Sequence, residues 1–472
     1  MAEREAFNIG SRRELFVDDF LVEEMKGGAR RILHAPRPRE IVLTHDRPWE
    51  GNTSAYHTFL RDGDRVLAYY RGSQQLVGGK RGHIEVTCVA ESTDGIVFRR
   101  PRVGLIPFRG SLANNIILTG KCSHNMAPFL DTNPACPAEA RYKAFGRQLN
   151  EAWKRMRASG DYTELPSPEE DGGLYGFVSP DGLRWTQTER PLIRDGAFDS
   201  QNVGFWDDVR GEYRAYYRDF HDGIRGIKTA TSPDFAEWTP GKWLDFDDAC
   251  DDQLYTNQIL PYERAPHIYV GFPTRFVPDR GQITEGLFMS SRDGVRFQRF
   301  DEAFLRPGPN RDRWGNRCCY IWQGVIETPS DVPGGENELS IFSTEHYYMG
   351  NANMVRRFTL RQDGFVSVNG PRSGGELLTK LFVFEGDRLT LNLSTSAIGS
   401  VRVEIQDSEG TALEGFALDD CDGAWGDTTE HTVTWKEEAD VSALAGKPVR
   451  LRFAMSDADV YSLRFCRSES LI

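Results

Sequence analysis

A short hairpin signature recurs along this chain and constrains its fold more than any other feature. Four copies pair a serine with an aspartate two residues later and have Phe or Trp close behind; they begin at Ser92, Ser179, Ser232 and Ser291. A looser fifth copy is Arg361–Phe365. Aspartate and glycine favour tight turns between strands. The first four copies lie 87, 53 and 59 residues apart with strand-like sequence between them, and this spacing indicates propeller blades.

A second repeat, out of phase with the first, consists of asparagines that each open an apolar or aromatic run. These asparagines are Asn52, Asn125, Asn202, Asn257 and Asn316. Each run leads into a second one, such as Arg65–Arg71 or Glu212–Arg218. Each unit therefore has the order inner strand, second strand, third strand, hairpin and outer strand. Together the two repeats predict an all-β chain with a five-bladed β-propeller.

The repeats also suggest domain boundaries. We expect the propeller to span residues 1–372, with a strand at Glu14–Leu21 closing the ring against the last blade. The polar segment at about 149–173 interrupts the second blade and is interpreted as an insertion. Beyond it, residues 373–472 alternate apolar and polar positions, as in Val401–Ile405, which predicts an antiparallel β-sandwich.

Composition narrows the possible partners and locations. The net charge of −13 argues against nucleic acid or an anionic membrane as a partner. No run of 18 apolar residues predicts a membrane span. The segment Met1–Phe7 lacks the apolar core of a signal peptide, so a cytoplasmic location is the default expectation, and a secreted or periplasmic one stays open if a leader is missing.

Cysteine and histidine spacing bears on metals and cofactors. The eight cysteines form no Cys-x-x-Cys pair and none lies at zinc-site spacing with a histidine. We therefore expect no metal site and no cofactor.

Propeller geometry predicts where chemistry takes place. Because neighbouring strands are antiparallel, the starts of first and third strands and the ends of second strands emerge on one face. The carboxylates at these positions are candidate catalytic residues: Glu50, Asp199, Asp219 and Glu345. Polar neighbours are candidate ligand contacts: Asn52, His57, Arg71, His124, Asn125, Asn202, Arg218, Asn257, Arg275, Glu285, Arg317 and His346. So many polar groups at one mouth require water or a ligand to satisfy them.

Most of these residues have a structural alternative. The asparagines would serve equally well to cap strand entries by bonding neighbouring backbone. The arginines Arg71, Arg218 and Arg275 would neutralise carboxylates near the axis, and Asp199 and Asp219 would be turn residues. His57, on an inner strand, is as suitable for the core as for a ligand contact.

The five hairpins followed by an alternating region resemble the five-bladed propeller glycoside hydrolases of the invertase, levanase, arabinanase and β-xylosidase type. The resemblance covers roughly residues 13–370 in repeat pattern. It implies a carbohydrate substrate and three carboxylates at the funnel mouth: a nucleophile or base, a general acid and a stabilising aspartate. The pair Arg218-Asp219 is similar to the first two residues of the Arg-Asp-Pro stabiliser motif of invertases.

The sequence also departs from that family. Trp49–Asn52 stands where a Trp-x-x-Asp-Pro-x-Gly motif would open the first blade, and no Glu-Cys motif supplies the acid. Asp219 falls in the third repeat, whereas the invertase motif belongs to the second. The chain therefore resembles a distant or separate family on the same scaffold.

The resemblance implies a glycoside hydrolase, which would be furanosidase-like or, given the number of arginines at the mouth, act on an acidic sugar. Glycosidic cleavage requires one protonated and one ionised carboxylate. Asp199 and Glu345 are the expected acid/base or nucleophile pair, and Asp219, held ionised by a neighbouring arginine, is the expected stabiliser of positive charge.

Two other functions stay open at this point. One is a carbohydrate-binding propeller without catalysis, which would bind sugar but turn over no substrate. The other is a sialidase-like enzyme that clamps an acidic sugar with an arginine cluster: Arg71, Arg218, Arg275 and Arg317. Sialidases have six blades and a residue between the Asp and Gly of their hairpins, which these hairpins lack.

Overall fold

The computed structural model describes residues 6–148, 172–246 and 252–468, and within them the chain is all-β. Short 3₁₀ turns are the only helical elements there: η1 (Lys121–His124), η2 (Ala138–Ala140), η3 (Pro278–Arg280), η4 (Arg311–Arg313) and η5 (Ser442–Leu444). The predicted insertion at 149–173 lies outside the described residues except for its last two. No helix in the described part of the chain is long and apolar enough to cross a membrane.

The chain divides into two compact units. The larger unit comprises Pro36–Tyr262 and Pro266–Thr359, and the smaller one comprises the residues up to Ala35, Glu263–Ala265 and the chain from Leu360 onward. We expected the second domain to begin near residue 373. The smaller unit also includes the N-terminal strands, because these pair with strands from the C-terminal part of the chain.

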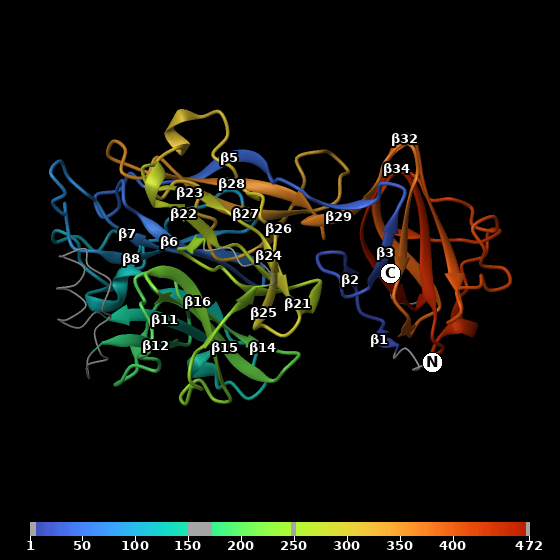
Figure 1. Cartoon of the computed structure of the whole chain (residues 1–472). Helices are drawn as coiled ribbons and strands as arrows, with labels where there is room; N and C mark the ends of the chain where they lie inside the picture. The colour runs from blue at the N-terminus through green and yellow to red at the C-terminus, as the bar shows by residue number, and fades with distance from the viewer. Residues whose placement is uncertain (1–5, 149–171, 247–251, 469–472) are drawn as a thin grey trace. The chain divides into compact units, whose positions relative to one another are not determined.

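The larger unit consists of small sheets, an arrangement consistent with a propeller (Figure 1). The first sheet contains β6 (Ala55–Asp62), β7 (Arg65–Gly72), β8 (Val86–Ser92) and β9 (Ile116–Thr119). The second contains β10 (Ala127–Leu130), β11 (Tyr142–Gln148), β12 (Gly173–Ser179) and β13 (Thr186–Gln187). The third contains β14 (Val203–Asp207), β15 (Glu212–His221), β16 (Ile224–Ser232) and β17 (Lys242–Trp243). Neighbouring strands in each are antiparallel.

The fourth repeat is divided between two sheets. One contains β18 (Asp245–Phe246), β25 (Arg296–Arg299), β24 (Met289–Ser291), β21 (Ala265–Gly271) and β20 (Leu260–Tyr262). The other contains β19 (Gln253–Leu254), β22 (Thr274–Val277) and β23 (Ile283–Gly286). The last sheet contains β26 (Ile326–Thr328), β27 (Glu338–Glu345), β28 (Met354–Arg361) and β5 (Arg37–Thr44).

An N-terminal strand completes the last sheet, but it is a different strand from the one that we expected. β5 pairs antiparallel with β28. The expected segment begins instead with β2 (Glu14–Leu15), which pairs with β34 (Arg450–Cys466) in the smaller unit. Both segments contain a short apolar run typical of a strand, Leu15–Val17 in one and Ile41–Leu43 in the other, so their sequence pattern does not distinguish between the two partners.

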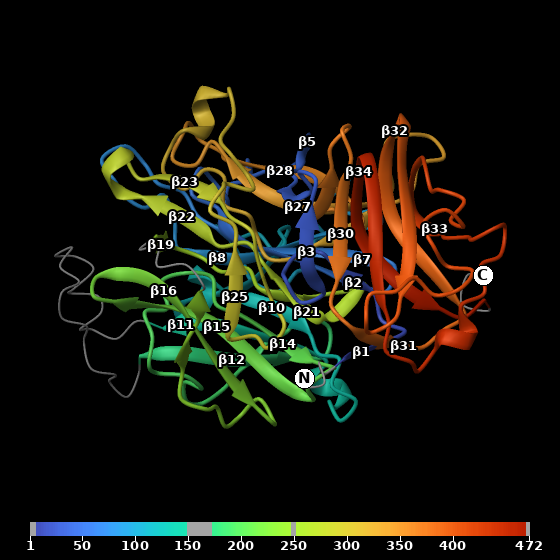
Figure 2. The same cartoon turned by 45° about the vertical axis from the view of Figure 1, so that its right-hand side comes forward.

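Long strands dominate the smaller unit. β32 (Arg388–Gln406) lies beside β34, in register from Arg388–Cys466 to Gln406–Arg450 (Figure 2). The same sheet contains β3 (Val22–Lys26), β4 (Arg30–Leu33), β29 (Val366–Gly370), β30 (Gly375–Thr379), β33 (Asp427–Thr432) and β2. β1 (Phe7–Gly10) pairs in parallel with β31 (Phe382–Phe384). Alternate residues of β32, such as Leu391 and Val403, are buried in the core.

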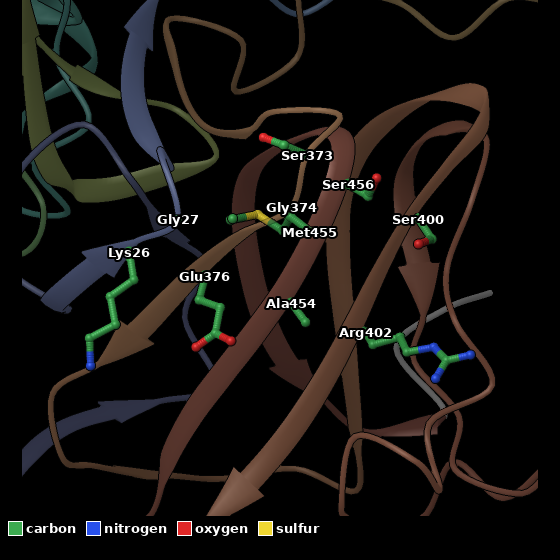
Figure 3. A pocket seen from close by; sticks show the side chains of 11 residues that line it. Lys26, Gly27, Ser373, Gly374, Glu376, Ser400, Arg402, Ala454, Met455 and Ser456 are labelled. Atoms are coloured by element: carbon green, nitrogen blue, oxygen red, sulfur yellow. The ribbon is translucent and has the colours of Figure 1, made fainter.

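A cavity of about 510 Å³ lies over this sheet of the smaller unit (Figure 3). Small residues line much of it, and longer side chains at its sides are Lys26, Glu376 and Arg402. None of the candidate site residues lines this cavity.

The four hairpins share one hydrogen-bond pattern. In the first, the Ser92 hydroxyl donates to Asp94 Oδ1 (2.7 Å), and that oxygen accepts from the backbone amides of Ile96 and Val97 (2.8 and 2.9 Å). The hairpins at 179, 232 and 291 repeat these bonds. In the third copy Phe235 replaces the glycine and adopts the same left-handed region, with φ of 66°.

The fifth copy forms a different turn. Asp363 itself has a φ of 58°, and its buried carboxylate accepts hydrogen bonds from Arg264, Asn392 and Ser462. Because no serine precedes it by two residues, the local bonds of the other four turns are not available.

The hairpin aspartates should contribute measurably to stability. The backbone amides of Leu183 and Arg184 each donate to Asp181 Oδ1 at 2.8 Å, and replacing Asp181 with alanine removes this acceptor. We expect a loss of about 1–3 kcal/mol in the free energy of unfolding, measured by urea denaturation. Arg184→Ala is the matched control, since it removes only an exposed ion pair to Asp181 and should cost less than about 1 kcal/mol. Equal effects of the two variants would contradict a role for the turn bonds.

Candidate active site

Two carboxylates are bridged by one histidine in the larger unit. His124, the last residue of η1, has Nδ1 2.9 Å from Glu85 Oε2 and Nε2 3.0 Å from Asp199 Oδ1. Asp199 also meets Arg147 Nη2 at 2.9 Å. The imidazole is buried, whereas the side chains of Glu85 and Asp199 keep 14% and 19% of their surface exposed. Both carboxylates are therefore accessible to solvent while the group between them is not.

Further contacts extend from this bridge. Arg71 Nη1 is 3.1 Å from the ring nitrogens of His124, and Arg71 Nη2 donates to the Tyr347 hydroxyl at 2.8 Å. The same hydroxyl is 3.4 Å from Arg317 Nη1, and Arg317 Nη2 is 3.5 Å from the Tyr255 hydroxyl. We call the residues joined in this way the Asp199 cluster: Arg71, Glu85, His124, Arg147, Asp199, Tyr255, Arg317 and Tyr347.

The series of contacts from Asp199 to Tyr255 leads back to the segment that carries Asp199. The backbone carbonyl of Tyr255 accepts a hydrogen bond of 2.7 Å from the Ser200 hydroxyl, next to Asp199. Arg218 lies with its guanidinium carbon 5.2 Å from the Tyr255 ring centroid and donates from Nε to the Ala197 carbonyl at 3.0 Å. The cluster thus forms a closed series of contacts among segments from several sheets.

Two asparagines position Asp199 against His124. Asn125 donates from Nδ2 to the carbonyls of Phe198, at 2.7 Å, and Ser200. Asn202 donates to the same two carbonyls at 3.1 Å each. Since these carbonyls flank Asp199, the two amides fix the backbone that carries the carboxylate.

The surroundings of the bridge bear on its protons. Burial lowers the pKa of His124, with Arg147 and Arg71 acting in the same direction and Glu85 and Asp199 in the opposite one, and the net effect favours the neutral imidazole. Burial alone would raise the pKa of Glu85, but its hydrogen bond with His124 and the nearby Arg71 and Arg81 hold it well below the ordinary value. A neutral imidazole carries one ring proton, so His124 can donate to only one of the two carboxylates at a time.

Some strained backbone lies in or beside the cluster. Left-handed φ values occur at Arg317 (62°), Tyr56 (56°), Tyr348 (63°) and His346 (61°), none of which is glycine. Arg71 lies over the Tyr56 ring, 4.9 Å from its centroid, and Arg317 lies 5.7 Å from that of Tyr348. Such strain is often found at functional sites.

Arg147 is one of the cluster residues that the sequence analysis missed. Arg71 is the seventh residue of the run Arg65–Arg71, and Arg218 is the seventh of Glu212–Arg218. The corresponding run in the second repeat begins at Arg141, and its seventh residue is Arg147. The alignment of these runs is therefore the signal that would have found it. The other three missed residues are Glu85, which directly precedes the third strand β8, Tyr255, and Tyr347, which follows the end of β27 without any repeat to mark it.

Glu50 lies in a different network. Its buried carboxylate accepts from the Tyr70 hydroxyl (2.6 Å), from Arg100 Nε (2.7 Å) and from the backbone amide of Arg47 (3.1 Å). Burial alone would raise its pKa, but His45 and Arg100 lower it to about 2. A fully buried, fully bonded carboxylate has no access to a substrate, and these contacts favour a structural role for Glu50.

Asp219 lies on the opposite face of β15 from Arg218, because successive side chains of a strand alternate. Its carboxylate pairs with Lys228 of β16 at 2.8 Å and accepts from the amide of Phe220. The neighbouring arginine that we expected to hold Asp219 ionised instead faces Tyr255.

Glu345 is bound by two arginines. Arg356 contacts both carboxylate oxygens, at 2.8 and 3.1 Å, and Arg313 Nε lies 3.4 Å away. The adjacent His346 is 3.5 Å from Asp312. Glu345 was one of the expected acid/base or nucleophile pair, but these arginine contacts favour a structural role for its buried carboxylate.

The remaining asparagine candidates also bond backbone. Asn52 donates to the carbonyls of Gln75 and Gly350, at 3.1 and 2.9 Å. Asn257 donates to Gln201 and Tyr216, at 3.4 and 3.3 Å. Asn125 and Asn202 bond backbone in the same way. These contacts favour the structural alternative for all four asparagines, in which their side chains bond neighbouring backbone and do not contact a ligand.

His57 and the Arg275–Glu285 pair complete the candidates. His57 is fully buried, with Nε2 2.9 Å from His45 Nε2 and its ring stacked on Tyr70. Arg275 donates to Glu285 at 2.7 Å and also meets Asp252. Among residues 6–148, 172–246 and 252–468, no group of three acidic, histidine or cysteine residues has a metal-holding arrangement.

The network around Glu50 makes stability depend on pH. The folded pKa of about 2 lies below the ordinary value of 4.5, so its contribution is present above pH 4.5 and is lost as the pH falls towards 2. Glu50→Gln should cost about 3–5 kcal/mol at pH 7, and the difference from wild type should shrink at pH 3, as measured by urea denaturation.

A half-exposed ion pair provides the control for this experiment. Glu376 bonds Arg452 at 2.7 Å, and Glu376→Gln should cost less than about 1 kcal/mol at pH 7. A Glu50→Gln penalty that stays constant between pH 7 and 3 would contradict the assignment.

Comparisons with known proteins give a likeness in fold. No family model and no curated protein match the sequence. Solved structures that match include a glycosyl hydrolase from Bacteroides ovatus (15% identity, TM-score 0.42, 75% of this chain and 94% of that one). Another is an N-acetylgalactosamine deacetylase from F. plautii (12% identity, TM-score 0.44, 69% of this chain and 94% of that one). A third is a β-1,2-mannobiose phosphorylase from Listeria innocua (10% identity, TM-score 0.42, 74% of this chain and 96% of that one). Likeness at this level assigns none of these activities to this chain.

Proposed function

We propose that this protein hydrolyses a glycosidic bond of a carbohydrate at the Asp199 cluster. The single observation that carries the proposal is the bridge Glu85–His124–Asp199, in which two partly exposed carboxylates share one buried imidazole. Glycosidic cleavage requires carboxyl groups in two roles, because one must donate a proton while another stays ionised.

In this proposal Asp199 is the general acid. Its carboxyl proton passes to the leaving oxygen of the glycosidic bond, and water supplies the hydroxyl that replaces the leaving group. Arg147, 2.9 Å from Asp199, stabilises the carboxylate that results. The attacking water loses one proton as its oxygen joins the sugar, and His124, 3.0 Å from Asp199, is placed to return that proton to the Asp199 carboxylate.

Glu85 takes the role of charge stabiliser, which we had expected for Asp219. Its low pKa makes it a weak base but keeps it negative throughout the reaction. It is therefore proposed to stabilise positive charge on the sugar ring as the bond breaks.

An acidic sugar is the substrate class that the charges favour over a neutral furanoside. Two carboxylates, Glu85 and Asp199, lie among four arginines, Arg71, Arg147, Arg218 and Arg317. Within the described residues, no carboxylate contacts the guanidinium of Arg218 or Arg317. A negatively charged group on the substrate would balance this excess.

The finer architecture is part of the same proposal. We propose five blades over the sheets of the larger unit, with the cluster at the mouth of their axis, and a sandwich for the C-terminal strands. The division of the sheets by repeat supports the former, and the alternating burial along β32 supports the latter.

Mutation of Asp199 tests the catalytic assignment. Wild-type protein should cleave at least one member of a panel of aryl uronides, pyranosides and furanosides. Asp199→Asn should lower kcat by about 10²–10⁴-fold, because acid–base assistance is worth that much. Asp219→Asn is the matched control, an identical substitution on the other face of β15, and should stay within about threefold of wild type.

Other outcomes would separate the alternatives. Equal activity of Asp199→Asn and wild type would overturn the assignment of the acid. Sugar binding by wild type without turnover on any substrate would instead support the non-catalytic binding function. A loss in Glu345→Gln as large as that in Asp199→Asn, with both variants folded, would restore the acid/base pair expected from the sequence.

A further inference from the structure

Arg317 differs from the other arginines of the Asp199 cluster in what balances its charge. Arg147 pairs with Asp199, and Arg71 lies 3.8 Å from Glu85 while its other nitrogen donates to the Thr53 carbonyl at 2.7 Å. Arg218 is 4% exposed and so has little contact with solvent. Arg317 is half-buried and, within the described residues, its polar contacts are with tyrosine hydroxyls only.

Tyrosine rings surround this guanidinium. Its central carbon lies 5.8, 5.7 and 5.7 Å from the ring centroids of Tyr255, Tyr347 and Tyr348. Aromatic faces attract a cation but do not neutralise it. A partly desolvated cation without a counter-ion is costly, so an incoming anion would be bound strongly.

The hydroxyl of Tyr255 is available as a second donor. The Tyr347 hydroxyl already contacts Arg71, Arg317 and the Thr53 carbonyl, whereas the Tyr255 hydroxyl, within the described residues, has a polar contact with Arg317 alone. Although burial opposes it, the nearby Arg317 and Arg218 lower the pKa of Tyr255, which strengthens its O–H as a donor.

The backbone at Arg317 supports a functional role for this geometry. Its φ of 62° lies in the left-handed region, which residues other than glycine adopt only at an energetic cost. The conformation directs the side chain between Tyr255 and Tyr347. Strain kept at a charged, half-buried residue beside a candidate active site indicates that the position of the guanidinium matters.

We infer that Arg317 and Tyr255 bind the carboxylate of a uronic acid residue in the substrate and determine the preference for acidic over neutral sugars. This inference rests on the proposed function of the same site. The carboxylate would accept two hydrogen bonds from Arg317 and one from Tyr255, next to the Asp199 carboxyl. Inorganic phosphate has the same oxyanion chemistry and is the competing occupant.

Variants of Arg317 test the inference through selectivity. kcat/KM is measured on an aryl uronide and on the matched aryl pyranoside, which differs only in its carboxylate. Arg317→Gln should lower the ratio of the two values by at least about 30-fold, with most of the change in KM for the uronide. Arg317→Lys should recover part of the ratio, and Tyr255→Phe should lower it less than Arg317→Gln. Arg311→Gln, an exposed residue of η4 with the same charge change, should leave it unaltered.

Two results would overturn the inference while leaving the proposed function intact. One is an unchanged ratio in Arg317→Gln when Asp199→Asn is inactive. The other is an equal loss on both substrates in a folded Arg317→Gln, because Arg317 would then only support the site. Cleavage by wild type that requires added inorganic phosphate and yields a sugar phosphate would overturn both the inference and the proposed hydrolysis, because it would assign the oxyanion to phosphate.

A binding measurement keeps the inference testable if no substrate is cleaved. Free glucuronate and glucose are titrated into wild type and Arg317→Gln by calorimetry, with inorganic phosphate as a third probe. Preferential binding of glucuronate by wild type, lost in Arg317→Gln, would uphold the inference although the proposed hydrolysis had failed. Equal binding of glucose and glucuronate by wild type would overturn it.

Discussion

The site depends on buried amide side chains that bond backbone across sheet boundaries. Asn125 and Asn202 both donate to the carbonyls on either side of Asp199. Gln201, next along the chain, donates to the His57 carbonyl at 2.8 Å and so joins the third repeat to the first. An unpaired buried carbonyl is costly, so each of these bonds is strongly favoured over its absence. Because they hold Asp199 against His124, the acid–imidazole contact is a consequence of how the sheets are joined.

Charge is distributed unevenly over the larger unit, and this distribution separates structural from functional carboxylates. Glu50 and Glu345 are each bonded to arginine and buried almost completely, and Asp219 is paired with a lysine of the adjacent strand. Glu85 and Asp199 are also paired, yet both keep some exposed surface. Exposure together with a shared histidine, and not the presence of a carboxylate near a strand end, distinguishes the pair that is suited to proton transfer.

Much of the architecture was predictable because it repeats. The serine–aspartate hairpins form the same local hydrogen bonds wherever they occur, so the sequence predicted the turn and its neighbouring strands. Arg71, His124, Asp199 and Arg317 were predicted at strand starts and ends that emerge together, and the structure connects all four through their contacts. Arg147 was equally accessible to this reasoning, since it occupies the position of Arg71 in the next repeat.

The sequence by itself determined the strands, the hairpins and the set of polar residues from which the site is drawn, because those depend on local patterns of two to seven residues. Only the tertiary structure decided that Glu85, and not Glu345 or Asp219, shares a histidine with Asp199, and that β5 rather than the segment at Glu14 completes the last sheet. The contact between Arg71 and Tyr347 joins residues 276 positions apart. Such pairings depend on which strand face each residue occupies and on how separate sheets meet, and no local pattern specifies either.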